Sequence, residues 1–319
     1  MIFISRFNQA PTKSTMKYLM LVVAGMALFF SGSATAQKQK TSTPVAQPSL
    51  VRTITHNETH RLGYGGTLTV IGAPEGSITI EGWSKNEVEV RAEIQLRADT
   101  EQDLDRLAAV NGFLLDEDLN HLRVLTTGTH DRAFMKKVKN FPKKLLGLPW
   151  KIDYRIRVPM SVDLDINAGR GPISLAGVEG NVRVSSPQSD AKLEFAGGTL
   201  STTIAVGKVT LKVLGRSWRG VGADIKVAAG DIVLELPPGF SGDIDADILR
   251  TGEIESTYEG LEAREKPGIT KQKIKGRLGS GGGFLSLTVG DGRIYIKKQT
   301  ADSRQSTANS QRQTVNGKQ

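Results

Sequence analysis

A short pattern of polar and apolar residues recurs along the middle of this 319-residue chain. In each copy a glycine is followed by alternating residues, as in Gly76-Ser-Ile-Thr-Ile80. Alternation with a period of two is typical of a β-strand that buries one face. A leading glycine permits a turn or a close approach that a Cβ atom would block. The copies occupy residues 66–70, 76–80, 171–175, 180–184, 207–211, 230–234, 242–246, 252–256, 283–287 and 292–296.

The turns between these copies favour a stack of parallel strands. Neighbouring copies begin about ten residues apart at their closest, which leaves room for one short strand and one turn. Two-residue hairpins favour Asn-Gly or Asp-Gly, yet only Asp291-Gly292 lies between two of these strands. We therefore predict an all-β fold, a single-stranded β-helix or β-solenoid. The alternative is a β-sandwich, because wider gaps such as Gly180 to Gly207 make the period irregular.

One stretch departs from this rhythm and predicts a short helical insertion. Thr100-Glu-Gln-Asp103 suits the start of a helix, and apolar residues follow at helical spacing. We expect an amphipathic helix at about 101–111, packed on the strands. The excursion spans about 98–149 and continues with a strand at 122–125 and a loop at 128–149, before alternation returns at 150–158.

The two ends of the chain have the composition of segments outside a folded domain. Residues 1–36 combine bases, an apolar run of about 13 residues and an Ala34-Thr35-Ala36 cleavage site, which is typical of a signal peptide. Either Met1 or Met16 suits the position of the initiator methionine. We expect export to the periplasm, the cell surface or the medium. The other expected parts are a flexible linker at 37–49, one domain at 50–298 and a disordered tail at 299–319.

Composition narrows the chemistry that the chain can perform. Lys and Arg number 42 against 33 Asp and Glu, and there is no cysteine. A disulfide framework, a Cys-ligated metal site and a thiol nucleophile are therefore excluded. The basic excess suits an anionic partner, although nucleic acid is a poor partner for an exported protein. We expect no cofactor. A metal site at His56 and His60 is not expected either, because on a strand these residues would lie about 13 Å apart.

A row of carboxylates is the strongest candidate for metal binding or acid–base chemistry. Asp243, Asp245 and Asp247 alternate with apolar residues, so on a strand they share one face. Oxygen ligands suit Ca²⁺, and Asp163 with Asp165 would add to the cluster from a neighbouring coil. An ordinary solvated strand face explains the same alternation, and we prefer that interpretation.

A run of bases with no acid among them lies in the expected loop. Phe134, Met135, Val138 and Phe141 are interleaved with the bases. Such a mixture suits an anionic membrane surface or an acidic glycan. Equally, it suits a solubilising loop whose aromatic residues pack against the body, which is the commoner case. The bases are Arg132, Lys136, Lys137, Lys139, Lys143 and Lys144.

Several stretches together resemble a known family. Gly76-Ser-Ile-Thr-Ile80, Tyr154-Arg-Ile-Arg-Val-Pro159 and Gly283-Phe-Leu-Ser-Leu287 look like the opening, centre and end of the putative bacterial adhesin family, whose function is unknown. The resemblance covers roughly residues 62–296 and depends on the order of these motifs. It implies a β-helix in an exported or membrane-linked bacterial protein. It implies no catalytic or binding residues.

These features predict an exported, non-enzymatic β-solenoid with an adhesin-like role. A stack of strands presents a long, repetitive surface. That surface suits envelope or extracellular glycans, partner proteins or another copy of the chain. One alternative is an enzyme similar to β-helical polysaccharide lyases, which would use the acidic row. Another is a purely structural module of the cell envelope.

Overall fold

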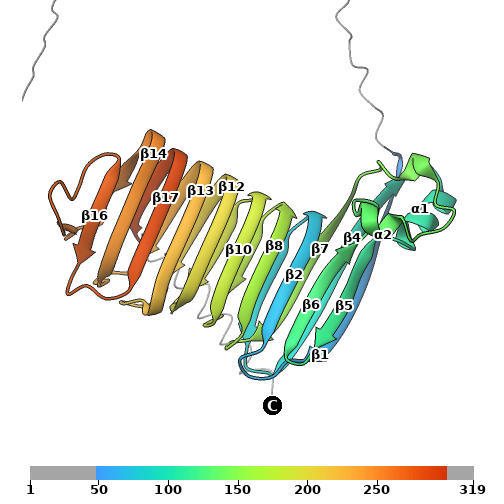
Figure 1. Ribbon diagram of the computed structural model, residues 1–319, viewed down its shortest axis with the longest axis horizontal. Helices are drawn as coiled ribbons and strands as arrows, with labels where there is room; N and C mark the ends of the chain where they lie inside the picture. The colour runs from blue at the N-terminus through green and yellow to red at the C-terminus, as the bar shows by residue number, and fades with distance from the viewer. Residues whose placement is uncertain (1–47, 300–319) are drawn as a thin grey trace, which may run out of the picture. The chain divides into compact units, whose positions relative to one another are not determined.

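Two layers of strands form the part of the protein that the structure, a computed structural model, describes (Figure 1). This part comprises residues 48–299, so the expected signal peptide, most of the linker and most of the tail lie outside it. The prediction of an all-β fold is confirmed. Within residues 48–299, no helix has the length and apolar character needed to span a bilayer.

The described residues contain many strands, two short α-helices and one 3-10 turn. In chain order the elements are β1 (Leu50–Arg61), β2 (Thr67–Glu75), β3 (Ile78–Trp83), β4 (Glu87–Ala98), α1 (Glu101–Ala108), β5 (Gly112–Asp118), β6 (His121–Thr127), α2 (Arg132–Met135), η1 (Lys143–Leu145), β7 (Trp150–Pro159), β8 (Asp163–Arg170), β9 (Ile173–Ala176), β10 (Asn181–Gln188), β11 (Ala191–Phe195), β12 (Gly197–Val213), β13 (Arg219–Leu236), β14 (Gly242–Ser256), β15 (Glu262–Ala263), β16 (Lys273–Leu278) and β17 (Phe284–Lys298).

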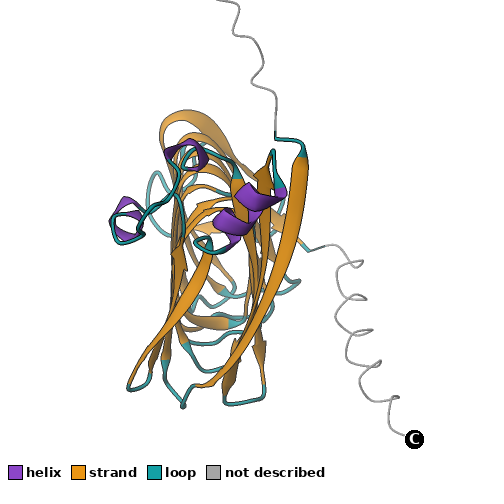
Figure 2. Cartoon of the chain, turned by 90° about the vertical axis from the view of Figure 1, so that its right-hand side faces the viewer, coloured by secondary structure: helices purple, strands orange, loops and turns teal. Residues whose placement is uncertain are grey.

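Strands that follow the glycines pair in parallel with their neighbours, and the chain passes repeatedly from one layer to the other (Figure 2). Layer A runs through β5, β6, β2, β8 and β10, the first halves of β12, β13, β17 and β14, and then β16 and β15. Layer B runs through β1, β4, β7, β3, β9 and β11 and the second halves of the same four long strands. Antiparallel pairs occur only towards the two ends of the stack, within the described residues.

The order of the stack differs from the order of the chain at both ends. The early strands β2 and β3 lie between the pair β6–β7 and the pair β8–β9. The last strand, β17, lies between β13 and β14. The coil formed by β2 and β3 and the last strand, β17, each have neighbours on two sides.

Apolar side chains of successive strands stand directly opposite one another and form continuous buried columns. Each side chain buried in this way contributes roughly 1.5–3 kcal/mol relative to exposure. One layer A column contains Leu122, Leu68, Leu164, Val182, Leu200, Ala223, Leu285 and Ile244.

Glycines form the corner at which the chain crosses between the layers. Gly230 has φ 138°, and a Cβ atom there would lie 1.9 Å from the carbonyl oxygen of Gly207 on the next coil. The following Asp231 accepts a hydrogen bond at 2.9 Å from the backbone N–H of Arg293. The recurring glycine is therefore required by close contact between coils.

The expected helix forms at one end of the two layers, between their edges (Figure 2). Thr100 caps α1 by accepting a hydrogen bond from the N–H of Asp103, as the sequence predicts. Leu104 and Leu107 are buried in the core. The expected loop at 128–149 differs from prediction in containing two short helical segments, α2 and η1.

Candidate functional site: an anchored basic loop

The loop of residues 128–149 joins β6 in layer A to β7 in layer B, at the end of the stack that carries α1 (Figure 1). The buried side chain of Asn111 holds its first residues. Its amide donates to the carbonyl of Leu107 at 3.1 Å, and its oxygen accepts from the N–H of Thr129 at 2.9 Å. The start of the loop is therefore tied to the end of α1.

Asp131 fixes the next turn of the loop. Its carboxylate accepts hydrogen bonds from the N–H groups of Ala133 and Phe134, at 2.8 and 3.1 Å, and so begins α2. These donors lower the pKa of Asp131. Beside it, the ring of His130 stacks at a tilt on Trp150, and partial burial lowers the pKa of His130.

A second anchor holds the far half of the loop. Leu145 is buried in the core, and the neighbouring Lys144 places Nζ 2.7 Å from a carboxylate oxygen of Asp103 on α1. The side chain of Asp103 is only 7% exposed. The hydrogen bond from Lys144 is the largest cause of the lowered pKa of Asp103. Lys144 is thus a structural residue, although the sequence suggests only a member of a charge run.

All six bases of the loop are exposed, but only Lys144 has an acid within ion-pair distance among the described residues. On the layers, bases commonly meet acids across strands, as in Lys212–Glu194 at 3.4 Å and Lys297–Glu235 at 3.2 Å. The loop therefore concentrates positive charge, of which Asp131 offsets only a part through its electrostatic interaction with Lys137. The five bases in question, here called the basic patch, are Arg132, Lys136, Lys137, Lys139 and Lys143.

The apolar residues of the loop face the body of the protein. Phe141 and Leu148 pack against the core. Phe134, Met135 and Val138 are half-buried. Leu146 is 42% exposed, and the smaller Ala133 and Pro149 are exposed as well. The loop thus presents cations with little apolar surface, which suits a hydrated anion better than the interior of a bilayer.

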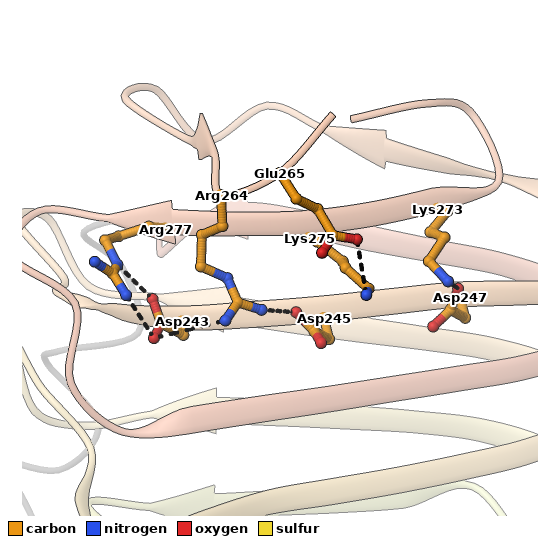
Figure 3. Close-up of polar contacts among 8 residues, drawn as sticks. All are labelled: Asp243, Asp245, Asp247, Arg264, Glu265, Lys273, Lys275 and Arg277. Carbon is orange, nitrogen blue, oxygen red and sulfur yellow. Dashed lines mark hydrogen bonds and ion pairs between the residues drawn. The ribbon is translucent and has the colours of Figure 1, made fainter. Parts of the chain in front are cut away.

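The acidic row lies on one face of β14, as its alternation predicts, but a basic side chain lies beside each of its carboxylates (Figure 3). The antiparallel strand β16 places Arg277, Lys275 and Lys273 directly opposite Asp243, Asp245 and Asp247. Arg277 binds Asp243 through two nitrogens, at 2.8 and 3.1 Å, and lowers its pKa. Arg264 pairs with Asp245, and Lys273 lies 3.3 Å from Asp247.

The acidic row is therefore a set of ion pairs: β16 supplies the partners of Asp243 and Asp247, and Arg264, just after β15, supplies the partner of Asp245. The alternating bases in Lys273-Ile-Lys-Gly-Arg277 were the sequence signal for these partners, and the sequence reasoning missed them. The expectation that Asp163 and Asp165 extend the row is wrong, because β8 is separated from β14 by β10, β12, β13 and β17.

The histidines near the N-terminal end of the domain lie on a strand, as expected. His56 and His60 both belong to β1, and His60 Nδ1 lies 3.5 Å from a carboxylate oxygen of Glu117 on β5. Across residues 48–299, no group of three His, Asp or Glu side chains is placed to hold a metal ion.

Comparisons with known proteins give no family assignment. No protein-family model matches the chain, including any for the family that the sequence resembles, and no curated protein matches it. A solved structure of a putative cell adhesion protein from Clostridium sporogenes is 14% identical, with a TM-score of 0.41, over 77% of this chain and 100% of that one. A putative adhesin from Bacteroides fragilis is 15% identical, with a TM-score of 0.29, over 79% and 99%. These scores are too low to carry an argument about fold or function.

Proposed function

We propose that this protein is an exported, non-enzymatic β-solenoid with an adhesin-like role, which binds an acidic envelope or extracellular glycan through its basic patch. The observation that carries the proposal is the set of five exposed bases with no acid within ion-pair distance among the described residues, on a loop anchored at both ends. Export is inferred from the basic, apolar and small-residue pattern of residues 1–36.

Anchoring supports binding because it reduces the entropy that the loop loses when a ligand binds. Asn111 and Asp131 hold the first half, and Lys144 with Leu145 holds the second. A polymer with repeated anionic groups would contact several bases at once. Exposed ion pairs contribute only about 0.2–1 kcal/mol each, so affinity requires that the patch acts as a group.

The geometry of the acidic row does not favour the lyase alternative. Asp243, Asp245 and Asp247 each have a basic partner. Arg277 lowers the pKa of Asp243, which makes that carboxylate a poor general acid or base near neutral pH. We therefore assign the acidic row a role in stabilising the fold.

Binding to labelled dextran sulfate, with neutral dextran as the reference, tests the proposed function. Substituting the basic patch with five glutamines should weaken binding about tenfold or more. Binding of the parent should also fall as salt is raised, because salt screens exposed charges.

A matched control separates the patch from net charge. Substituting five other exposed bases with glutamine removes the same charge from other parts of the domain and should leave most of the binding intact. Equal losses in the two variants, or no binding of dextran sulfate by the parent, would refute the proposal. Binding to phosphatidylglycerol vesicles without binding to dextran sulfate would instead identify a membrane surface as the partner. The control bases are Arg155, Arg183, Lys192, Lys208 and Arg216.

A further inference from the structure

Tyr64, in the turn between β1 and β2, has the most exposed Phe, Tyr or Trp ring of the described residues, with 85% exposure. Hydrogen bonds hold the backbone of this turn. The side chain of Asn120 accepts from the N–H of Gly63 at 2.9 Å and donates to the carbonyl of Tyr64 at 3.4 Å. The N–H of Gly65 donates to the carbonyl of Ser161 at 3.3 Å. The ring therefore contributes little to the core, and its fixed backbone reduces the entropy lost when a ligand packs on it.

Tyr64 lines one end of a shallow groove with a volume of about 310 Å³. The groove crosses five neighbouring coils, in the order β2, β8, β10, β12 and β13. Val221, which is 76% exposed, lies at its other end. Four spacings between adjacent strands give a length of about 19 Å. A groove of this shape suits a linear ligand better than a compact one.

Glycine backbone lines the middle of the groove, at Gly180, Gly198 and Gly220. Close contact between coils requires these glycines. A Cβ atom on Gly198 would lie 2.6 Å from the carbonyl oxygen of Gly180, and one on Gly220 would lie 2.9 Å from the nitrogen of Gly198. The glycines by themselves therefore indicate no ligand. Their consequence is a surface without side chains, on which a ligand can approach the backbone closely.

Three successive strands place a carboxylate, an amide and a hydroxyl next to one another in the groove. Asn181 stands opposite Thr199, and its backbone N–H and side-chain amide donate to Oδ1 of Asp163 at 2.8 and 3.1 Å. Within residues 48–299, no hydrogen bond engages the other carboxylate oxygen of Asp163, the side-chain carbonyl of Asn181 or the hydroxyl of Thr199. These groups can therefore exchange hydrogen bonds with the hydroxyl groups of a ligand.

The charges around the groove favour a neutral ligand. Two acids line it, Asp163 and Glu179. Arg219 lies 2.6 Å from Glu179 and neutralises it. The remaining carboxylate of Asp163 repels an anionic sugar.

We propose that this groove binds a linear, neutral oligosaccharide of β-linked pyranose rings, with one ring stacked on Tyr64. Such a sugar is flat and extended, and it carries C–H groups on its faces and hydroxyl groups along its edges. The C–H groups pack on the aromatic ring, and the hydroxyl groups meet the polar side chains. The groove contains no residue of the basic patch, so this site is independent of the proposed binding of an acidic glycan.

Titration of the full-length protein with cellotetraose, followed by NMR, tests the proposal. The amide signals of Gly180, Gly198 and Gly220 should shift at millimolar sugar. Tyr64→Ala should weaken binding about tenfold because the stacked ring is lost. Tyr64→Phe keeps the ring and should bind like the parent. The affinity should not change as salt is raised, because cellotetraose carries no charge.

Two further variants are the controls. Tyr295→Ala removes a tyrosine ring from layer B and should bind cellotetraose like the parent. The variant with five glutamines in the basic patch should also bind it like the parent. Unshifted glycine amides in the parent, unchanged affinity in Tyr64→Ala, or loss of binding in the five-glutamine variant would overturn the proposal.

Discussion

Thr202 is a polar residue in an otherwise apolar column of layer A. It stands directly opposite Val184 on one side and Ile225 on the other, and it is fully buried. Its hydroxyl has no hydrogen-bond partner within the described residues. A buried hydroxyl without a partner destabilises a folded protein, because it loses its hydrogen bonds to water.

Replacing this hydroxyl with a methyl group should therefore stabilise the fold. We expect Thr202→Val to raise the free energy of unfolding by about 1–3 kcal/mol. Urea denaturation followed by circular dichroism measures the change. Thr203→Val alters the exposed neighbour and should have little effect. A Thr202→Val protein no more stable than the parent would show that the hydroxyl is satisfied.

Corner glycines test the close contact between coils. Gly230→Ala should lower the free energy of unfolding by about 2 kcal/mol or more, because the added Cβ would meet the carbonyl oxygen of Gly207 at a φ that L-residues rarely adopt. Gly147→Ala is the control, since a Cβ there meets nothing within 4 Å. Equal midpoints for the two variants in thermal unfolding would contradict this account of the corner.

At the scale of elements, the loop of residues 128–149 depends on its contact with α1. In Lys144→Met the nearly buried carboxylate of Asp103 loses its closest cation. We expect faster hydrogen exchange at the loop amides, with little change in the layers. Lys143→Met removes the same charge without touching Asp103 and should exchange like the parent. Unchanged exchange in Lys144→Met would show that Leu145 suffices as the anchor.

The same contact predicts a dependence on pH. The pKa of Asp103 is lower in the folded protein than its ordinary value of about 3.9. Its ionised form therefore stabilises the anchor fully above that value, and the stabilisation is lost as pH falls through the lowered pKa. The pKa of Asp131 is lowered as well, so its stabilisation of the loop is also lost as the pH falls below the ordinary range of an aspartate. Protection factors of the loop amides should stay level between pH 7 and pH 5 and fall below about pH 4. A fall near pH 6 would implicate a histidine instead.

Local patterns in the sequence predicted the elements well. Alternation after glycine predicted the strands, and Thr100 predicted the start of α1, because both signals depend on neighbouring residues. The charge run located the basic patch. The ion pair of Lys144 with Asp103 could not be predicted, because the two residues are 41 positions apart and meet only after α1 and η1 have packed.

At the scale of the whole described fold, the order of the coils could not be predicted from the sequence. Alternation determines which side chains face inward, but each coil contributes similar Leu, Ile and Val residues to the same columns. Such columns do not distinguish one neighbour from another. The insertions of β2–β3 and of β17 therefore arise from connections and end strands that act over long distances along the chain.

We assign different roles to the layers and to the loop: the layers stabilise the fold, and the loop binds the ligand. Cross-strand pairs such as Lys212–Glu194 neutralise charge on the layers, whereas the basic patch is exposed and has no acid within ion-pair distance among the described residues. A ligand that depends on the patch should leave a footprint restricted to residues 128–149. A ligand that recognises the repetitive layers should leave a footprint across several coils.

Hydrogen exchange of the parent protein, measured with and without dextran sulfate, tests this division most directly. We predict slower exchange at the amides of residues 128–149 and unchanged exchange across the exposed strands of layers A and B. Protection spread across the layers, with none in the loop, would contradict it.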